Sequence, residues 1–263
     1  LWRGGPNTAK GADYYWNVNK QSAHLLDEIR KAFTEGNQEK AEMLTRQNFN
    51  SEVSYDADGE TPFRFGSFTT MGEFYVETGL NIIGMSDYKR ILSLDSAMAV
   101  VQFKKDHVVY QRNYFISYPA NVMVMRFSAD QPGKQNLVFS YAPNPVSTGN
   151  MASDGNKGLV YSASLDNNGM KYVVRIQAET KGGTLFNADG KLTVKGADEV
   201  VFYITADTDY KPNFDPDFKD PKTYVGVNPE ETTKQWMNNA VSQRYTALFS
   251  QHYNDYAALF DLV

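Results

Sequence analysis

Apolar and polar residues alternate most regularly between Asp87 and Gly133, where the pattern repeats every second residue. In a β-strand successive side chains point to opposite faces, so this period is that of a strand with one apolar face. Polar or proline-containing breaks at 104–106 and 119–121 divide the segment into three runs. We therefore predict a meander of three long antiparallel strands joined by short turns, at 97–103, 110–118 and 122–127.

Helical spacing of apolar residues appears earlier in the chain, at about 22–49. One predicted helix ends at Gly36, because glycine readily takes the backbone conformation that closes a helix. Its apolar face holds Leu25, Leu26, Ile29 and Phe33. A second helix is predicted at about 38–48, with Ala41, Leu44 and Phe49 as its apolar side. We expect this helical pair to be an insertion ahead of the strands.

The pattern becomes helical again after Asn228. Asparagine is a good N-cap, Pro229 suits the first helical position, and the acids Glu230 and Glu231 favour the positive end of the helix dipole. Apolar residues then recur at helical spacing as far as Phe249, and a further helical stretch is predicted at 252–260. We expect residues 226–263 to be a helical linker.

The remaining segments add strands and turns. A polar loop is predicted at 144–157, and the continuous apolar run at 199–205 is typical of a strand that is buried on both faces. The whole chain contains about twelve predicted strands. This number favours a mainly β fold with two large antiparallel sheets, a β-sandwich domain over residues 1–225, rather than a small barrel.

Composition limits the class of protein. The 263 residues are 41% hydrophobic, which is typical of a folded globular chain, and carry a net charge of −5, which argues against general nucleic-acid binding. The chain has no cysteine, so disulfides, thiol catalysis and cysteine–zinc sites are excluded. No apolar run reaches the roughly 20 residues that span a bilayer, so no membrane span is predicted. We expect the sequence to be a piece of a longer protein.

Acidic residues are numerous, but their number alone identifies no active site. Inverting glycoside hydrolysis needs two carboxyl groups about 6.5–9.5 Å apart, and 31 acids make a chance pair at that distance almost certain. Asp87 and Asp95 flank the first strands and are interpreted as turn residues. Of the three histidines, His24 and His107 are expected to face solvent. His252 is interpreted as a packed, hydrogen-bonded helix residue, with a site contacting a further domain as the alternative.

An acidic segment near the end of the strands offers a candidate metal site. Calcium takes several oxygen ligands from one flexible loop, and Asp207, Asp209, Asp215 and Asp217 could provide them. Proline residues interrupt the segment, and it lacks the D-x-D-x-D-G pattern of calcium loops. A solvated acidic loop is the alternative. No cofactor is predicted.

Aromatic residues near the start of the chain offer a candidate sugar site. Tyr14, Tyr15 and Trp16 are consecutive, and aromatic faces can stack on sugar rings. Docking of these side chains onto the sandwich, or onto a neighbouring domain, is the alternative interpretation. The two Gly-Gly pairs lack the spacing of a phosphate-binding loop and are interpreted as turns.

Several short motifs together resemble a known family. They are Leu1-Trp2-Arg3-Gly4-Gly5-Pro6, Glu28-Ile29-Arg30, 41–49, Gly66-Ser67-Phe68, Met71-Gly72-Glu73, Tyr88-Lys89-Arg90, Leu94-Asp95, 110–119, Gly196-Ala197-Asp198-Glu199, His252, Asp255-Tyr256 and Phe260. In this order they span nearly the whole chain, which resembles the N-terminal domain of glycoside hydrolase family 95, the inverting α-L-fucosidases and their α-galactosidase relatives. Arg3 stands where the family usually has serine.

The resemblance implies a galactose-mutarotase-like β-supersandwich that packs through a helical linker against an (α/α)6 barrel of the same polypeptide. In the family that barrel holds the catalytic residues, so the resemblance implies no catalytic residue in this chain. It implies a parent enzyme that releases terminal α-L-fucose, or a related galactose, from a glycan substrate by inversion. A periplasmic or secreted location is expected. A free-standing carbohydrate-binding module and a structural interaction domain remain the alternative functions.

Overall fold

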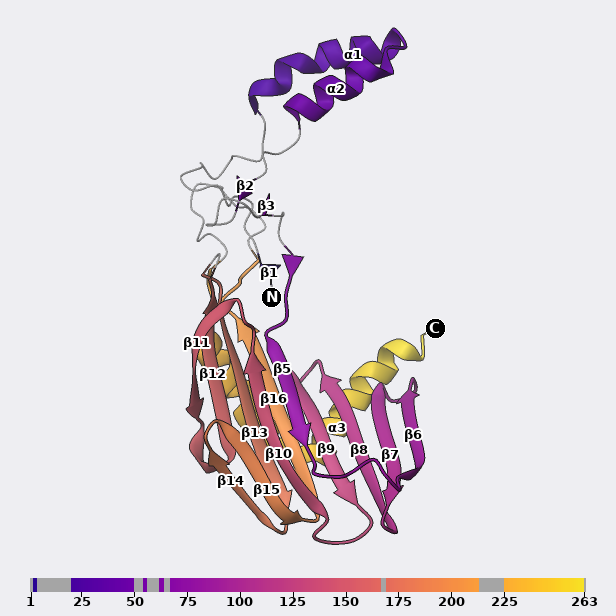
Figure 1. Cartoon of the computed structure of the whole chain (residues 1–263), viewed down its shortest axis with the longest axis vertical. Helices are drawn as coiled ribbons and strands as arrows, with labels where there is room; N and C mark the ends of the chain where they lie inside the picture. Colours follow the sequence, from indigo (N-terminus) through magenta and orange to yellow (C-terminus); the bar gives the residue numbers. More distant parts are fainter. Residues whose placement is uncertain are drawn as a thin grey trace. The chain divides into compact units, whose positions relative to one another are not determined.

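The computed structural model describes the residues 2–3, 20–49, 54–55, 62–63, 67–166, 169–212 and 225–262. These residues form two compact units. One unit comprises residues 1–69 and 211–225, and the other comprises residues 70–210 and 226–263. Figure 1 labels the elements of both units.

The first unit contains the predicted helical pair. Its elements are η1 (Lys20–Leu25), α1 (Leu26–Thr34), α2 (Gln38–Asn48) and the two-residue strands β1 (Trp2–Arg3), β2 (Ser54–Tyr55), β3 (Pro62–Phe63) and β4 (Ser67–Phe68). Asn37 caps α2, because its side-chain oxygen accepts a hydrogen bond from the Lys40 amide. The predicted helices are confirmed in type and position.

The apolar face predicted for the first helix is only partly correct. Ile29 and Ala32 are buried together with Ala41 of α2, whereas Phe33 is 56% exposed. Two short helices bury only the narrow stripe along which they touch, and that stripe follows Ala32 rather than Phe33.

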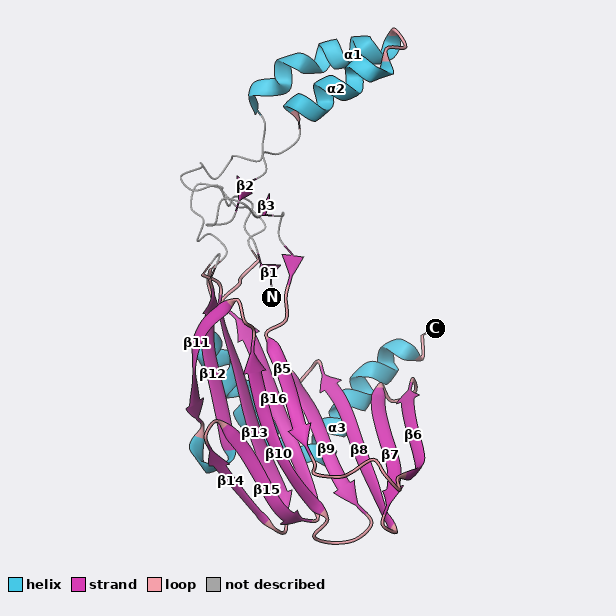
Figure 2. Cartoon of the chain, viewed as in Figure 1, coloured by secondary structure: helices cyan, strands magenta, loops and turns pink. Residues whose placement is uncertain are grey.

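The second unit consists of two antiparallel sheets with twelve strands (Figure 2). The larger sheet has the order β11 (Ser147–Ser153), β12 (Gly158–Leu165), β13 (Lys171–Lys181), β16 (Glu199–Thr208), β9 (Val122–Ala129), β8 (Val108–Ser117), β7 (Met98–Lys105) and β6 (Ser86–Ser93). The smaller sheet has the order β14 (Thr184–Ala188), β15 (Lys191–Ala197), β10 (Gln135–Pro143) and β5 (Gly72–Glu77). The mainly β sandwich predicted from the sequence is confirmed.

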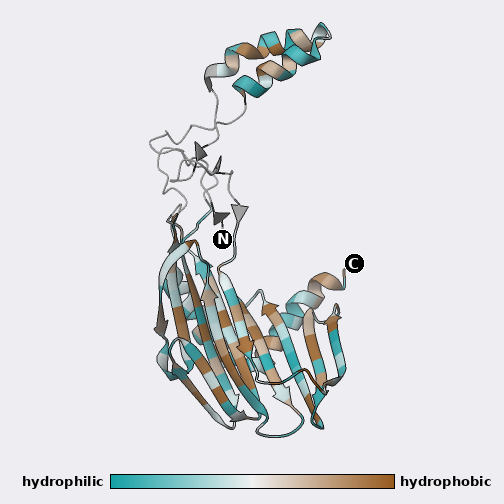
Figure 3. Cartoon of the chain, in the orientation of Figure 1, coloured by the Kyte–Doolittle hydropathy of each residue, from teal (hydrophilic) through white to brown (hydrophobic). Residues whose placement is uncertain are grey.

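The meander is also confirmed, as β7, β8 and β9. Tyr114 lies opposite Ala99 of β7 and Met125 of β9, so these residues share the sheet face that the alternation predicted. The alternation of apolar and polar residues along these strands is visible in Figure 3.

Two predictions for segments next to the meander are wrong. The segment 144–157 is not simply a loop, because it contains β11, which pairs along its length with β12, and the short 3₁₀ helix η2 (Gly155–Lys157). As a polar edge strand, β11 has no apolar face that periodicity could reveal. Asp87 lies within β6 at an irregularity of register rather than in a turn, and it has a positive φ of 52°.

The core lies between the two sheets. Phe202 of β16 stacks on Phe139 of β10, with ring centroids 4.6 Å apart, and meets Phe127 of β9 edge-on at 5.9 Å. Aromatic pairs at these distances contribute about 0.5–1.5 kcal/mol beyond the area they bury. The contacts join the smaller sheet to the middle of the larger one.

Helix α3 (Pro229–Phe260) packs on the opposite face of the larger sheet, behind β13, β16, β9 and β8 in Figure 1. Met237, Ala240 and Leu248 are fully buried there against Phe115 and Tyr203. Asn228 caps the helix as predicted, since its side chain accepts from the Glu230 amide. The two predicted helical stretches form one element with a kink at Arg244, where the backbone is non-helical (φ 59°, ψ 172°).

Candidate functional site

Five of the residues predicted to bind ligands lie outside the described residues. These are the aromatic residues Tyr14, Tyr15 and Trp16, and the acids Asp215 and Asp217. Their proposed roles in sugar and calcium binding stay predictions.

Asp207 and Asp209 are described, and both carboxylates accept hydrogen bonds from the protein. Asp207 accepts from the Thr232 hydroxyl at 2.6 Å, which ties β16 to the first turn of α3. Asp209 is 5% exposed and accepts from the Lys171 amide at 3.1 Å. Burial raises the pKa of the Asp209 carboxyl above its ordinary value. Through these hydrogen bonds, the two acids stabilise the end of β16.

The histidines lie where the sequence suggested. His24 and His107 are exposed. His252 is buried, stacks on Phe115 with ring centroids 4.9 Å apart, and lies 3.1 Å from the Ser96 carbonyl and 3.2 Å from the Ala97 carbonyl through Nε2. Both neighbours are acceptors, so Nε2 carries the proton and donates to them. His252 thus packs α3 against the turn between β6 and β7.

A groove of about 560 Å³ opens between the sheets at the end where β5 begins. Its walls are largely apolar and include Phe74 of β5, Ile116 and Tyr118 at the end of β8, Tyr141 of β10 and Trp236 of α3. A volume of this size is typical of ligand pockets. Sequence reasoning did not identify these residues, because they come from segments far apart in the chain.

Two tyrosines fix one wall of the groove. The hydroxyls of Tyr141 and Tyr172 both donate to the Met71 carbonyl, at 2.7 and 3.2 Å, immediately before β5. Tyr172 also bonds the Ser147 hydroxyl at 2.7 Å. Burial raises the pKa of both tyrosines, so they stay neutral and keep these bonds at any physiological pH. The start of β5 is therefore held in place.

The N-terminal end of α3 is held by a buried arginine. Arg175 of β13 binds Asp154 at 2.7 Å and Glu230 of α3 at 3.2 Å. The Ser162 hydroxyl donates to the second oxygen of Glu230. These contacts link the N-cap of η2, β12, β13 and the first turn of α3, so they hold the end of the helix that carries Trp236 into the groove wall.

Acidic residues are scarce in the groove. Among the lining residues that the structure describes, Asp207 is the one carboxylate, whereas inverting hydrolysis needs two. Within the described ranges no group of three or more histidine or acidic residues could hold a metal ion. The helices in those ranges also include none that is long and apolar enough to cross a membrane.

The two packed sheets, with a helix on the outer face of the larger one, define an antiparallel β-sandwich domain. A family model described as "Glycosyl hydrolase family 65, N-terminal domain" matches residues 1–213, and the chain belongs to this family. The expectation of an N-terminal glycoside hydrolase domain is confirmed. The family model names family 65, so it does not confirm the narrower prediction of family 95.

Three curated proteins are similar over almost the whole chain. "Probable alpha-fucosidase A" of Aspergillus niger is 29% identical over 99% of the chain. "Alpha-L-fucosidase 2" of Arabidopsis thaliana is 24% identical over 100% of the chain. "Probable alpha-fucosidase A" of Aspergillus oryzae is 24% identical over 98%. The chain spans about a third of their lengths, between 31% and 34%. A solved structure titled "Putative kojibiose phosphorylase from human microbiome" has a TM-score of 0.48 and 10% identity, and the match covers 70% of this chain and 27% of that chain.

Proposed function

We propose that the chain is the non-catalytic N-terminal sandwich of a glycoside hydrolase that releases terminal α-L-fucose, or a related galactose, from glycans with inversion, as family 95 enzymes do. The observation that carries this proposal is the similarity to three proteins named as α-fucosidases over 98–100% of the chain. Asp207 is the one carboxylate among the described lining residues of the groove, which agrees with chemistry located elsewhere in the polypeptide.

The domain's own role in this proposal is to pack against a catalytic barrel of the same polypeptide and to shape the entrance of its active site. Exposed apolar side chains near the end of α3 support such packing, because Leu259 and Leu262 are 67% and 81% exposed. The glycan substrate would be met outside the cytoplasm, in the periplasm or after secretion.

The test is an assay of the longer polypeptide on α-linked fucosides and galactosides, with the product followed by proton NMR. The proposal predicts release of fucose or galactose, with the β-anomer appearing first because inversion of an α-glycoside gives a β-sugar. Release of the α-anomer first would contradict inversion. Absence of both sugars would contradict the proposed activity.

The groove favours a second candidate, a carbohydrate-binding module. Tyr118 is 82% exposed at its rim, and Trp236 is half-buried in its wall, so aromatic faces are available to a sugar ring. Titration calorimetry with methyl fucosides would show saturable binding without turnover if this candidate is correct. The matched variant Trp236→Ala should then weaken binding by at least tenfold, while Tyr210→Ala, outside the groove, should not.

A further inference from the structure

The larger sheet has a notch at the 560 Å³ groove. Strand β16 pairs with β13 as far as Thr208, but it pairs with β9 only as far as Ile204. Among the described strands, residues 205–208 therefore have a neighbour on one side only. Ala206 and Asp207 of this stretch line the groove, together with the tip of the β8–β9 hairpin. Backbone groups on the open side of β16 can therefore hydrogen-bond a ligand in the groove.

The two sides of the groove differ in polarity. Ile204 lies two positions after Phe202 on the same strand face, so it faces the smaller sheet. On the side of α3 lies Asp207, whose carboxylate bonds the first turn of that helix. Ile116 and Ser117 are neighbours on β8, so they lie on opposite faces of the sheet. A sugar ring has the same division, with apolar C–H faces and a polar rim of hydroxyls.

The Ser117 hydroxyl is buried beside the groove without a partner. The residue is 0% exposed, and its oxygen has no hydrogen-bond partner among the described residues. A buried hydroxyl that lacks a partner costs free energy, so such groups are uncommon in folded proteins. Because Ser117 lines the groove, a hydroxyl of a bound ligand would supply the missing partner.

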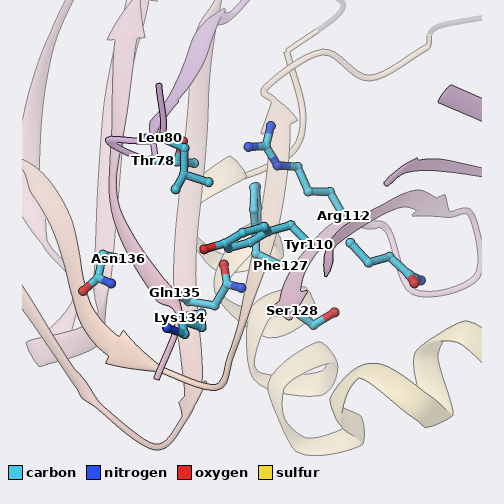
Figure 4. Close-up of a pocket in the computed structure, with 10 residues that line it drawn as sticks. Thr78, Leu80, Tyr110, Arg112, Phe127, Ser128, Lys134, Gln135 and Asn136 are labelled. Atoms are coloured by element: carbon cyan, nitrogen blue, oxygen red, sulfur yellow. The ribbon is translucent and has the colours of Figure 1, made fainter. Parts of the chain in front are cut away.

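A smaller hollow in the same unit shows a different case. It lies between Leu80 and Tyr110 and has room for about one water molecule at 10 Å³ (Figure 4). Figure 4 shows Gln135 beside Tyr110, and the side-chain nitrogen of Gln135 also lacks a partner among the described residues. One water molecule is enough to satisfy that nitrogen. The groove beside Ser117 is far larger and is of the size that ligands occupy.

Aromatic side chains from three elements line the groove. Phe74 of β5 is held by Phe139 and Tyr141, with ring centroids 5.8 and 5.4 Å away. Tyr118 is 82% exposed, and Trp236 of α3 is half-buried. An aromatic ring that is open to a groove can pack against the C–H face of a sugar ring. Tyr118 and Trp236 therefore gain burial when a ring binds.

The charge of the groove limits the kind of sugar that it can bind. Asp207 brings a carboxylate, and the described lining residues include no lysine, arginine or histidine. An acidic sugar would add a second negative charge near Asp207 without a cation to balance it. Like charges repel more strongly in a partly buried site than in bulk water. The groove therefore suits a neutral sugar.

We propose that the groove binds a neutral sugar ring of the glycan that the longer enzyme cleaves. The C–H face of the ring packs against Trp236 and Ile204, and its hydroxyls bind Ser117 and the open side of β16. The inference rests on the proposed function and adds a ligand class to it, neutral rather than acidic glycans. Recognition depends on ring polarity and charge, so the bound sugar need not be fucose.

Titration calorimetry of the chain 1–263 tests this selectivity. The probes are lacto-N-tetraose, a neutral tetrasaccharide without fucose, and the same tetrasaccharide carrying one sialic acid. The proposal predicts saturable binding of the neutral probe and at least about tenfold weaker binding of the sialylated one. Asp207→Asn should reduce this difference. Absence of binding to the neutral probe, or equal affinity for both, would overturn the proposal.

The two probes also separate this inference from the proposed function. Neither probe carries fucose, so their binding does not depend on fucose release. Release of fucose by the longer protein, without binding of lacto-N-tetraose to the chain 1–263, would overturn the inference alone. Binding of lacto-N-tetraose without any sugar release by the longer protein would contradict the proposed activity and leave the neutral-sugar site standing.

The Ser117 hydroxyl gives a second test. Ser117→Ala should weaken binding of lacto-N-tetraose by about fivefold, because one hydrogen bond to the sugar is lost. It should not lower the melting temperature, because the hydroxyl has no partner within the described chain. The control Thr184→Ala, at an exposed position outside the groove, should change neither quantity. Unchanged binding in Ser117→Ala would overturn the proposal.

Nuclear Overhauser effects locate the sugar without any substitution. With isoleucine methyl groups labelled, the proposal predicts contacts from lacto-N-tetraose ring protons to Ile116 and Ile204. Ile91 is the matched control, because it is 49% exposed on β6 and does not line the groove. Contacts to Ile91 in place of Ile116 and Ile204 would overturn the proposal.

Discussion

Strands β16 and β6 belong to the same sheet but lie in opposite environments. Five consecutive residues of β16, from Val200 to Ile204, are buried, because α3 covers one face and the smaller sheet covers the other. In β6, Tyr88, Ile91 and Leu92 are all at least 49% exposed. The middle of the sheet therefore buries far more apolar surface than β6 does, and burial of apolar surface is the dominant favourable contribution to folding.

Phe202 and Leu92 lie in one cross-strand row of the larger sheet, and the greatest loss of stability is expected at Phe202. Phe202→Ala should lower the free energy of unfolding by about 3–5 kcal/mol, because it leaves a cavity between Phe139 and Phe127. Leu92→Ala, in the same row at β6, should change it by less than about 0.5 kcal/mol in the chain 1–263. Urea unfolding of both variants measures the difference, and similar losses would show that the two ends are equally buried.

A smaller effect is expected from the ion pairs beneath α3. Arg175→Ala should lower the unfolding free energy by about 2 kcal/mol, because it leaves Asp154 and Glu230 without their buried partner. The loss is moderate because both acids are partly exposed to solvent. Arg46→Ala removes an exposed ion pair with Glu42 in the helical pair and should cost less than about 0.5 kcal/mol. Chemical denaturation measures both losses of unfolding free energy. Equal losses for the two variants would show that burial does not strengthen the contacts of Arg175.

A gain in stability is expected when Arg244, at the kink in α3, is replaced by glycine. Arg244 has a positive φ of 59°, which glycine adopts without strain. Arg244→Gly should therefore raise the unfolding free energy by about 1 kcal/mol, whereas Arg244→Ala keeps the strain and should not raise it. Thermal unfolding of the two variants distinguishes strain from side-chain contacts. A loss of stability in Arg244→Gly would mean that the contacts of the arginine outweigh the strain.

The smallest effect concerns pH and Asp209. Burial raises its pKa above the ordinary 3.8, so ionisation in the folded state is penalised, and stability is lost as pH rises through the folded pKa. Asp209→Asn keeps an oxygen for the Lys171 amide and removes the charge. The variant should be more stable than the parent at pH 7, and this advantage should shrink toward pH 3. An advantage that stayed constant with pH would exclude the ionisation of Asp209 as its cause.

Much of the fold could be predicted from periodicity and capping. The meander, the continuous apolar run of β16 and the Asn228 cap each carry a local signal in the sequence. Strand β11 carries none, since it is a polar edge strand. The groove could not be predicted, because Phe74, Ile116 and Trp236 meet only after the sheets and α3 have packed. The packed role of His252 was predicted, but its partners Ser96 and Ala97 could not be read from the sequence.

The proposed function places this sandwich in a glycoside hydrolase whose chemistry lies elsewhere in the polypeptide. The most direct measurement compares the turnover of an α-L-fucoside by purified chain 1–263 and by the longer protein at equal concentration. Release is expected from the longer protein and not from the chain 1–263. Release by the chain 1–263 would contradict the proposed function, because it would place the catalytic acid pair within these residues.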